Sequence, residues 1–123
     1  MQQAVIRGRP YGLEEISEEE FAKIVRVIVE AIDPEQIILF GSRAGGDFRR
    51  DSDLDLLIVD SQPFDTTRSR RKEITRIGDL LDVVPLAIDI LLHSREEVEY
   101  WRDSLNNVVA RALREGRVLY ERS

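Results

Sequence analysis

Apolar residues follow a helical period in residues 16–33, where they form one stripe between charged positions. Ser17 and Glu20 stand at the spacing of a capping box, in which each side chain bonds to the backbone N–H of the other residue. Asp33-Pro34 closes the segment, because the residue before a proline avoids helical backbone angles. The pattern therefore predicts an amphipathic helix.

Shorter apolar runs, rich in β-branched residues, predict three buried strands further along the chain. A Gly-rich polar connection separates the first two strands, and a second helical pattern separates the last two. In chain order the predicted elements are a strand at 36–40, a strand at 53–59, a helix at 66–82 and, after Pro85, a strand at 86–92.

The C-terminal part carries a third helical pattern. Ser94 and Glu97 offer another capping box, the helix is expected to break near Asp103, and Gly116 is expected to stop its continuation. Residues 117–123 then form a tail that can extend. Helices and strands in this order predict a mixed α+β fold, with a small mixed β-sheet packed with helices.

One domain spanning residues 1–123 is expected, with residues 1–15 as a loose arm. The 42% hydrophobic content is ordinary for a globular chain, and the lack of cysteine excludes disulfides and thiolate zinc sites. The N-terminus lacks the apolar core of a signal peptide, and no apolar run approaches the roughly 20 residues that span a bilayer. A cytoplasmic location away from membranes is expected.

The chain is acidic, with a net charge of −6 and a pI near 4.9, which argues against unspecific binding to nucleic acid or to an anionic membrane. A local basic run nevertheless stands at residues 68–72, where the second helix begins. Such a run is either a solvated helix face or a contact for nucleotide, RNA or an acidic partner. The sequence leaves both interpretations open.

Acidic residues head an otherwise apolar strand. Asp53 and Asp55 are two positions apart, so in a strand they share one face, and they repel each other unless a cation lies between them. Oxygen ligands of this kind favour Mg²⁺ or Mn²⁺. Asp89 is the only polar residue inside the third strand, so it could join the cluster if the two strands are neighbours. Three carboxylates could hold two ions about 3.5–4 Å apart.

Other interpretations of these carboxylates need no metal cluster. A calcium loop starting at Asp51 is excluded, because its sixth position would be Leu56 instead of Gly and its twelfth Gln62 instead of Glu. The strand could instead begin at the surface with its acidic residues solvated, and Asp89 could be an edge or strand-end carboxylate. The residues alone leave these two alternatives open.

Gly41-Ser42 directly follows the first strand. Glycine lets the backbone approach a ligand closely, Ser42 adds a hydroxyl, and Arg43 adds a positive charge, which together suit a phosphate. A tight turn that needs a glycine at positive φ is the simpler interpretation of this pair taken alone.

The combination is more specific than any of its parts. Gly41-Ser42, the later Asp-Leu-Asp at 53–55 and a distant Asp in a strand resemble the nucleotidyltransferase superfamily of the DNA polymerase β type. The string GSRAGGDFRRDSDLDLLIV looks like the minimal nucleotidyltransferases, which in bacteria and archaea often stand beside a HEPN-domain protein. The resemblance covers roughly residues 17 to 120 and implies the nucleotidyltransferase fold.

The resemblance also implies roles for the candidate residues. Gly41 and Ser42, with Arg43 beside them, would hold the triphosphate of ATP, and Asp53, Asp55 and Asp89 would bind two Mg²⁺ or Mn²⁺ ions. The implied reaction moves AMP from ATP to a hydroxyl, and in the minimal family the acceptor is a tyrosine of a HEPN toxin, which is silenced. The alternatives are a non-catalytic module that neutralises the partner by binding, and a transferase directed at RNA or a small molecule.

Overall fold

The computed structural model describes residues 17–41, 54–84 and 86–122, so the predicted arm at 1–15 lies outside the described residues. None of the helices in the described ranges is long and apolar enough to cross a membrane. In chain order the elements are α1 (Glu18–Ile32), β1 (Gln36–Phe40), β2 (Leu54–Asp60), α2 (Arg70–Leu80), the short 3₁₀ helix η2 (Leu81–Val83), β3 (Ile88–Ser94), α3 (Arg95–Trp101), α4 (Val108–Glu115) and β4 (Arg117–Glu121).

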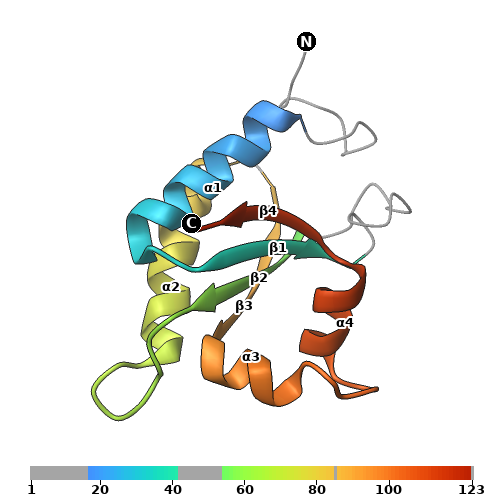
Figure 1. Ribbon diagram of the computed structural model, residues 1–123. Coiled ribbons are helices and arrows are strands. Elements are labelled where there is room, and N and C mark those ends of the chain that lie inside the picture. The colour runs from blue at the N-terminus through green and yellow to red at the C-terminus, as the bar shows by residue number, and fades with distance from the viewer. Residues whose placement is uncertain (1–16, 42–53, 85, 123) are drawn as a thin grey trace.

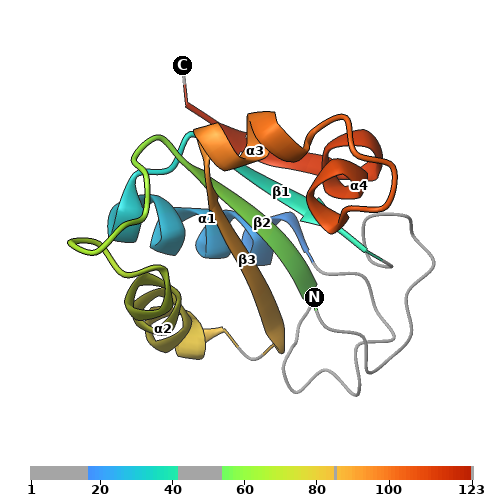
Figure 2. The same ribbon diagram turned by 90° about the horizontal axis from the view of Figure 1, so that it is seen from below.

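The strands of the described residues form a four-stranded mixed sheet in the order β3-β2-β1-β4 (Figure 1). β2 and β3 are parallel and are joined by the crossover through α2, whereas β1 pairs antiparallel with both β2 and β4. Figure 2 shows α1 and α2 on one face of the sheet and α3 and α4 on the other. The predicted α+β class, with a small mixed sheet packed with helices, is confirmed.

The central strand β2 is buried on both faces. Leu54, Leu56 and Ile58 pack into the core under α1 and α2, as the alternation in the sequence predicts. Leu57 and Val59 point the other way, into a second cluster with residues of α3 and α4. Because helices cover both faces, β2 is an almost continuous apolar run, and a polar side chain on it is exceptional.

Several predicted boundaries are confirmed by the observed caps. Ser17 and Glu20 form the capping box of α1, and Asp33 ends that helix in the left-handed conformation. Ser94 and Glu97 form the second box, at the start of α3. The predicted break before the last helix is present, because α3 ends at Trp101 and α4 begins after an Asn cap.

Two predictions are corrected. The second helix begins at Arg70 instead of residue 66, because Asp65 accepts hydrogen bonds from the Thr67 backbone and hydroxyl, at 2.8 and 2.7 Å. These bonds hold a turn, and Ser69 then caps the helix. The predicted tail is in fact strand β4, which completes the edge of the sheet beside β1.

Gly116 sets how closely α4 approaches the sheet. A Cβ at this position would lie 2.4 Å from the carbonyl oxygen of Ala112, 2.6 Å from Ile38 Cγ2 and 2.8 Å from the carbonyl oxygen of Leu39. Such distances are far inside van der Waals contact. The predicted helix stop is confirmed, and its glycine also lets the chain pass directly over β1 into β4.

Candidate active site

Asp55 and Asp89 lie side by side on neighbouring strands. Each is the second residue of its strand, and the parallel register of β2 and β3 pairs them directly. Both share the face on which Leu57 and Leu91 pack toward α3 and α4. Backbones paired in this way are about 4.8 Å apart, so the two carboxylates leave the sheet together at one end of it. From the sequence, Asp89 could lie near Asp55 only if their strands were neighbours in the sheet, and the structure shows that they are.

Gly41 lies at the same end, because β1 runs antiparallel to β2 and ends opposite Asp55. Its φ is +79°, and a Cβ here would lie only 2.3 Å from Asp55 Oδ2. A side chain at position 41 would therefore be strained by its backbone and would displace the carboxylate. The positive φ that was predicted for this glycine is confirmed. The close approach that the structure shows is to Asp55, and an approach to a phosphate stays a prediction.

The environments of the two carboxylates differ. Asp55 is half-buried, whereas Asp89 is exposed on the edge strand β3, as the edge-carboxylate interpretation expects. Within the described residues, Asp89 forms no hydrogen bond or ion pair. The remaining predicted site residues, Ser42, Arg43 and Asp53, lie outside the described residues, and their roles stay predictions.

Two adjacent carboxylates with only oxygen donors suit a hard divalent cation better than zinc. Among the residues that the structure describes, no three side chains of the His, Cys, Asp or Glu type gather as a metal site. The predicted set has its third member, Asp53, outside those ranges. The oxygen donors of the described pair thus fit part of a magnesium site.

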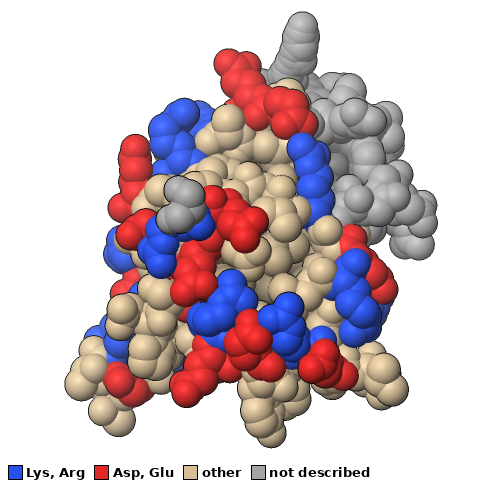
Figure 3. Space-filling view, viewed as in Figure 1, with Lys and Arg blue, Asp and Glu red and all other residues tan. Residues whose placement is uncertain are grey.

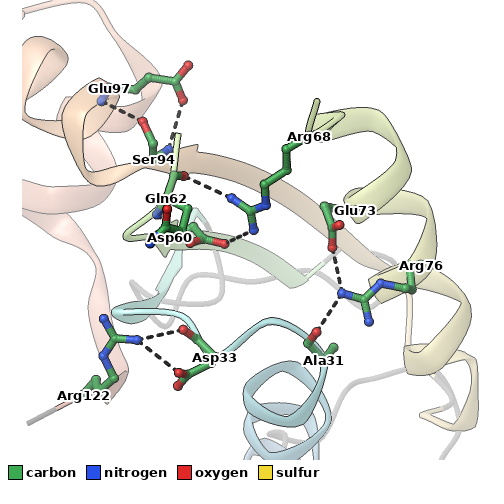
Figure 4. Close-up of polar contacts among 10 residues, drawn as sticks. All are labelled: Ala31, Asp33, Asp60, Gln62, Arg68, Glu73, Arg76, Ser94, Glu97 and Arg122. Atoms are coloured by element: carbon green, nitrogen blue, oxygen red, sulfur yellow. Dashed lines mark hydrogen bonds and ion pairs between the residues drawn. The ribbon is translucent and has the colours of Figure 1, made fainter. Parts of the chain in front are cut away.

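The opposite end of β2 carries a different kind of carboxylate. Asp60, the last residue of β2, has a side chain only 3% exposed, and its Oδ2 lies 2.5 Å from Nη2 of Arg68 (Figure 4). Its Oδ1 accepts a hydrogen bond of 2.9 Å from the backbone N–H of Gln62. A buried carboxylate with a cation and a backbone donor is a structural feature. The sequence analysis missed it, although an Asp closing an apolar strand and an Arg eight residues later could have suggested it.

Glu97 adds a second group of polar contacts at the end of the sheet that carries the Asp60–Arg68 ion pair, and it links β3 with α3. Its carboxylate accepts from the Ser94 backbone N–H at 3.0 Å and from Arg70, and it lies 3.1 Å from Nδ1 of His93. Burial opposes the ionisation of Glu97, but these partners outweigh it and hold the pKa of the carboxyl below its ordinary value of 4.5. The side chain of His93 therefore lies against Glu97, a member of the capping box of α3.

Further ion pairs surround α3. Arg95 contacts Glu35 at 2.8 Å and Glu99 at 3.2 Å, and Arg102 contacts Glu99 at 2.6 Å. Figure 3 shows positive and negative side chains interspersed on this face of the molecule. Tyr100, near the end of α3, is 77% exposed and so lies outside the core.

The mixed sheet, with Asp55 and Asp89 adjacent at one end and Gly41 against Asp55, is compatible with the resemblance found in the sequence. The chain belongs to the family described as polymerase beta nucleotidyltransferase, whose sequence model matches residues 22–123. It is similar to a Haemophilus influenzae protein named probable protein adenylyltransferase MntA, with 38% identity over 79 residues. The match takes in 63% of this chain and 65% of the relative, so the chain spans less than two-thirds of the relative's length.

Solved structures show the same fold at low sequence identity. A toxin–antitoxin with AMP-PNP matches with a TM-score of 0.51 and 22% identity, over 88% of this chain and 76% of the other. A tri-AMPylated Shewanella oneidensis HEPN toxin in complex with its MNT antitoxin matches with a TM-score of 0.50 and 18% identity, over 86% of this chain and 74% of the other. At these identities the likeness concerns the fold.

Proposed function

We propose that this chain transfers AMP from ATP to a hydroxyl group, using Mg²⁺ or Mn²⁺. The observation that carries the proposal is the direct pairing of Asp55 with Asp89 in the parallel register, with Gly41 against Asp55 at the same end of the sheet. Two carboxylates held side by side repel each other, and a divalent cation bound between them would relieve that repulsion. Membership of the family supplies the reaction class.

In the proposed reaction the backbone at Gly41, with Ser42 and Arg43, holds the triphosphate, and Asp53, Asp55 and Asp89 hold the metal ions. Two bound ions would neutralise the triphosphate and lower the pKa of the acceptor hydroxyl. Asp89, the exposed carboxylate, accepts the proton of that hydroxyl. The acceptor oxygen then bonds to the α-phosphorus of ATP as the bond to the β-phosphate oxygen breaks, and pyrophosphate leaves.

The proposed acceptor is a tyrosine of a HEPN-domain partner. Support comes from the relative named a protein adenylyltransferase and from the fold match to an antitoxin bound to an AMPylated HEPN toxin. An acceptor hydroxyl must be held in line with the α-phosphate, and a partner protein's surface can do this. Neutralisation of the partner by binding alone is the second candidate, but binding needs no paired carboxylates. A transferase directed at RNA or at a small molecule is the remaining alternative, and the experiment below tests RNA as the acceptor.

The test offers each of the four α-labelled nucleoside triphosphates and Mg²⁺ to the protein, together with a HEPN protein from an adjacent gene, a bulk RNA fraction, or neither. We expect label from ATP on the HEPN protein, and mass spectrometry should place a gain of one or more AMP units on a tyrosine. Asp55→Asn should abolish the gain. Asp79→Asn, which removes the same charge from an exposed position on α2, should not.

The competing functions predict different results from the same mixtures. If the Asp55→Asn protein fully inhibits a HEPN partner that stays unmodified, neutralisation is by binding. Label in RNA instead of protein would identify an RNA-directed transferase. Metal dependence is checked by calorimetry of ATP binding with and without EDTA, where equal affinity would contradict the metal-bridged site.

A further inference from the structure

The basic run at residues 68–72 is built into a defined surface at the start of α2. The guanidinium groups of Arg68 and Arg70 lie over the ring of Phe64, at 4.6 and 5.1 Å from its centroid. Each is also paired with a carboxylate of the network described above, Arg68 with Asp60 and Arg70 with Glu97. These two cations are therefore fixed in place and largely neutralised.

The next two cations are different. Arg71 and Lys72 are exposed, and within the described residues their side chains form no hydrogen bond or ion pair. They stand in the first turn of α2, whose N-terminus carries the positive end of the helix dipole. A positive charge there is unfavourable for the helix, and Glu73 is the only acidic residue in the turn. The run thus lowers the stability of its own helix, and a bound anion would reverse that.

A hollow lies beside these cations. It has a volume of about 640 Å³, enough for a few amino-acid side chains. Its apolar part comes from Phe64 and Ile74. The cations of Arg68, Arg70 and Arg71 and the single carboxylate of Asp65 also line it, with Ser69 and Thr75. Arg68 pairs with Asp60 at the end of β2, and Asp55 lies about 16 Å back along that strand. The hollow therefore lies toward the end of β2 that is opposite the paired carboxylates.

We propose that this hollow is a docking site for an acidic segment of a partner protein. Carboxylates of that segment pair with Arg71 and Lys72, and an apolar side chain between them packs against Phe64 and Ile74. A protein segment suits the surface better than RNA does, because the net charge of −6 repels a long polyanion beyond the hollow.

The proposal concerns where a partner is held and does not depend on which hydroxyl is modified. A short fluorescent peptide of alternating Glu and Leu serves as the probe, and fluorescence anisotropy measures its binding. Comparison probes are the same peptide with Lys in place of Glu, and oligouridine RNA of equal length. We expect saturable binding of the acidic peptide that weakens as salt is added, because the contact is charge-dependent.

Charge-reversal variants locate the binding. Arg71→Glu with Lys72→Glu should weaken the acidic peptide by about tenfold or more, since two favourable charges become repulsive. Lys23→Glu with Arg111→Glu makes the same change in net charge on other helices and should leave affinity nearly unchanged. Asp55→Asn should bind the peptide like the parent, even if transfer of AMP is absent or abolished, so failure of the proposed function and failure of the docking site are distinguishable.

Several outcomes would overturn the docking site. One is tighter binding of the RNA than of the acidic peptide, which would assign the run to nucleic acid. Others are equal binding of the acidic and basic peptides, equal loss in both double variants, or no saturation of the acidic peptide up to about 1 mM, the weak end of specific recognition.

Discussion

The two ends of β2 and β3 carry carboxylates in opposite circumstances. At one end Asp60 is buried, and Arg68 and a backbone N–H satisfy it. At the other end Asp55 and Asp89 are paired with each other by the strand register, and Asp89 is exposed with no ion pair to any described residue. The same residue type is thus paired with a buried cation at one end and stands beside a like charge at the other.

The two ends differ in what their carboxylates contribute: those at the Asp60 end stabilise the fold, and those at the Asp89 end belong to the proposed site. Charges that the fold itself pairs hold the crossover loop and the start of α2 and α3 against the sheet. Charges that the fold places side by side, as it does Asp55 and Asp89, repel each other and suit the binding of a cation. Substitutions at the Asp89 end should therefore lower the proposed transfer activity, whereas substitutions at the Asp60 end should lower the free energy of unfolding.

The largest expected effect is on activity at the Asp89 end. Asp89→Asn should lower AMP transfer by about a thousandfold, since a metal-bound carboxylate contributes several kcal/mol to the transition state. The melting temperature should stay the same or rise, because repulsion from Asp55 is relieved. Transfer rates and thermal unfolding of the same preparation measure both. A large fall in melting temperature with rates intact would assign Asp89 a structural role.

At the other end the expected effect is on stability. Arg68→Ala removes the cation from buried Asp60 and its stacking on Phe64, and it should cost about 3 kcal/mol of the free energy of unfolding, or roughly 10 °C. Transfer activity per folded molecule should be retained. Urea unfolding measures the loss, with Arg111→Ala as a matched control on an exposed cation. A change below the control's would show that the ion pair is dispensable.

A smaller effect should appear with pH. The pKa of Glu97 is lowered on folding, so its stabilisation is present above 4.5 and is lost as pH falls through the lower folded-state value. Glu97→Gln should therefore unfold with a weaker pH dependence than the parent below pH 4.5. Asp65, bonded to Thr67, and Glu99, bonded to Arg102, also have lowered pKa values, so only the difference between variant and parent is informative. Identical pH profiles would remove Glu97 from the stabilising network.

The smallest effect should come from a position that belongs to neither end. Gly78 lies within α2, and a Cβ there would meet nothing within 4 Å. Gly78→Ala should stabilise the protein by up to about 1 kcal/mol, because alanine favours a helix and loses less backbone entropy on folding. Thermal unfolding measures the gain, and transfer activity should not change. A loss of stability would mean that α2 is packed more tightly at this point than its surroundings indicate.

The sequence predicts most of the fold, because most elements have a strong local signal. The apolar run of β1 and the capping boxes at Ser17 and Ser94 needed no knowledge of the tertiary structure. The strand β4 was missed because it is an edge strand, in which Arg117, Val118 and Glu121 are all exposed. An edge strand has no buried face strong enough to leave a period in the sequence.

The candidate site was predictable only in part, for a similar reason. The alternation around Asp55 shows which face its side chain takes, but no local pattern says that β3 is the neighbour of β2 or that the register pairs Asp55 with Asp89. The contact of Gly41 with Asp55 depends likewise on the antiparallel pairing of β1. The ion pair of Asp60 with Arg68 was not predicted, because its two residues are not related by the periodicity of a helix or a strand.

The parallel pairing of β2 and β3 also has a consequence for how the proposed site is assembled during synthesis. The strands β1 and β2 can associate early, because antiparallel neighbours are close in the chain. Asp89 reaches Asp55 only after the whole crossover through α2 has been made and closed against the sheet. A chain still emerging from the ribosome therefore holds half of the carboxylate pair, and the proposed nucleotide site is completed late in synthesis.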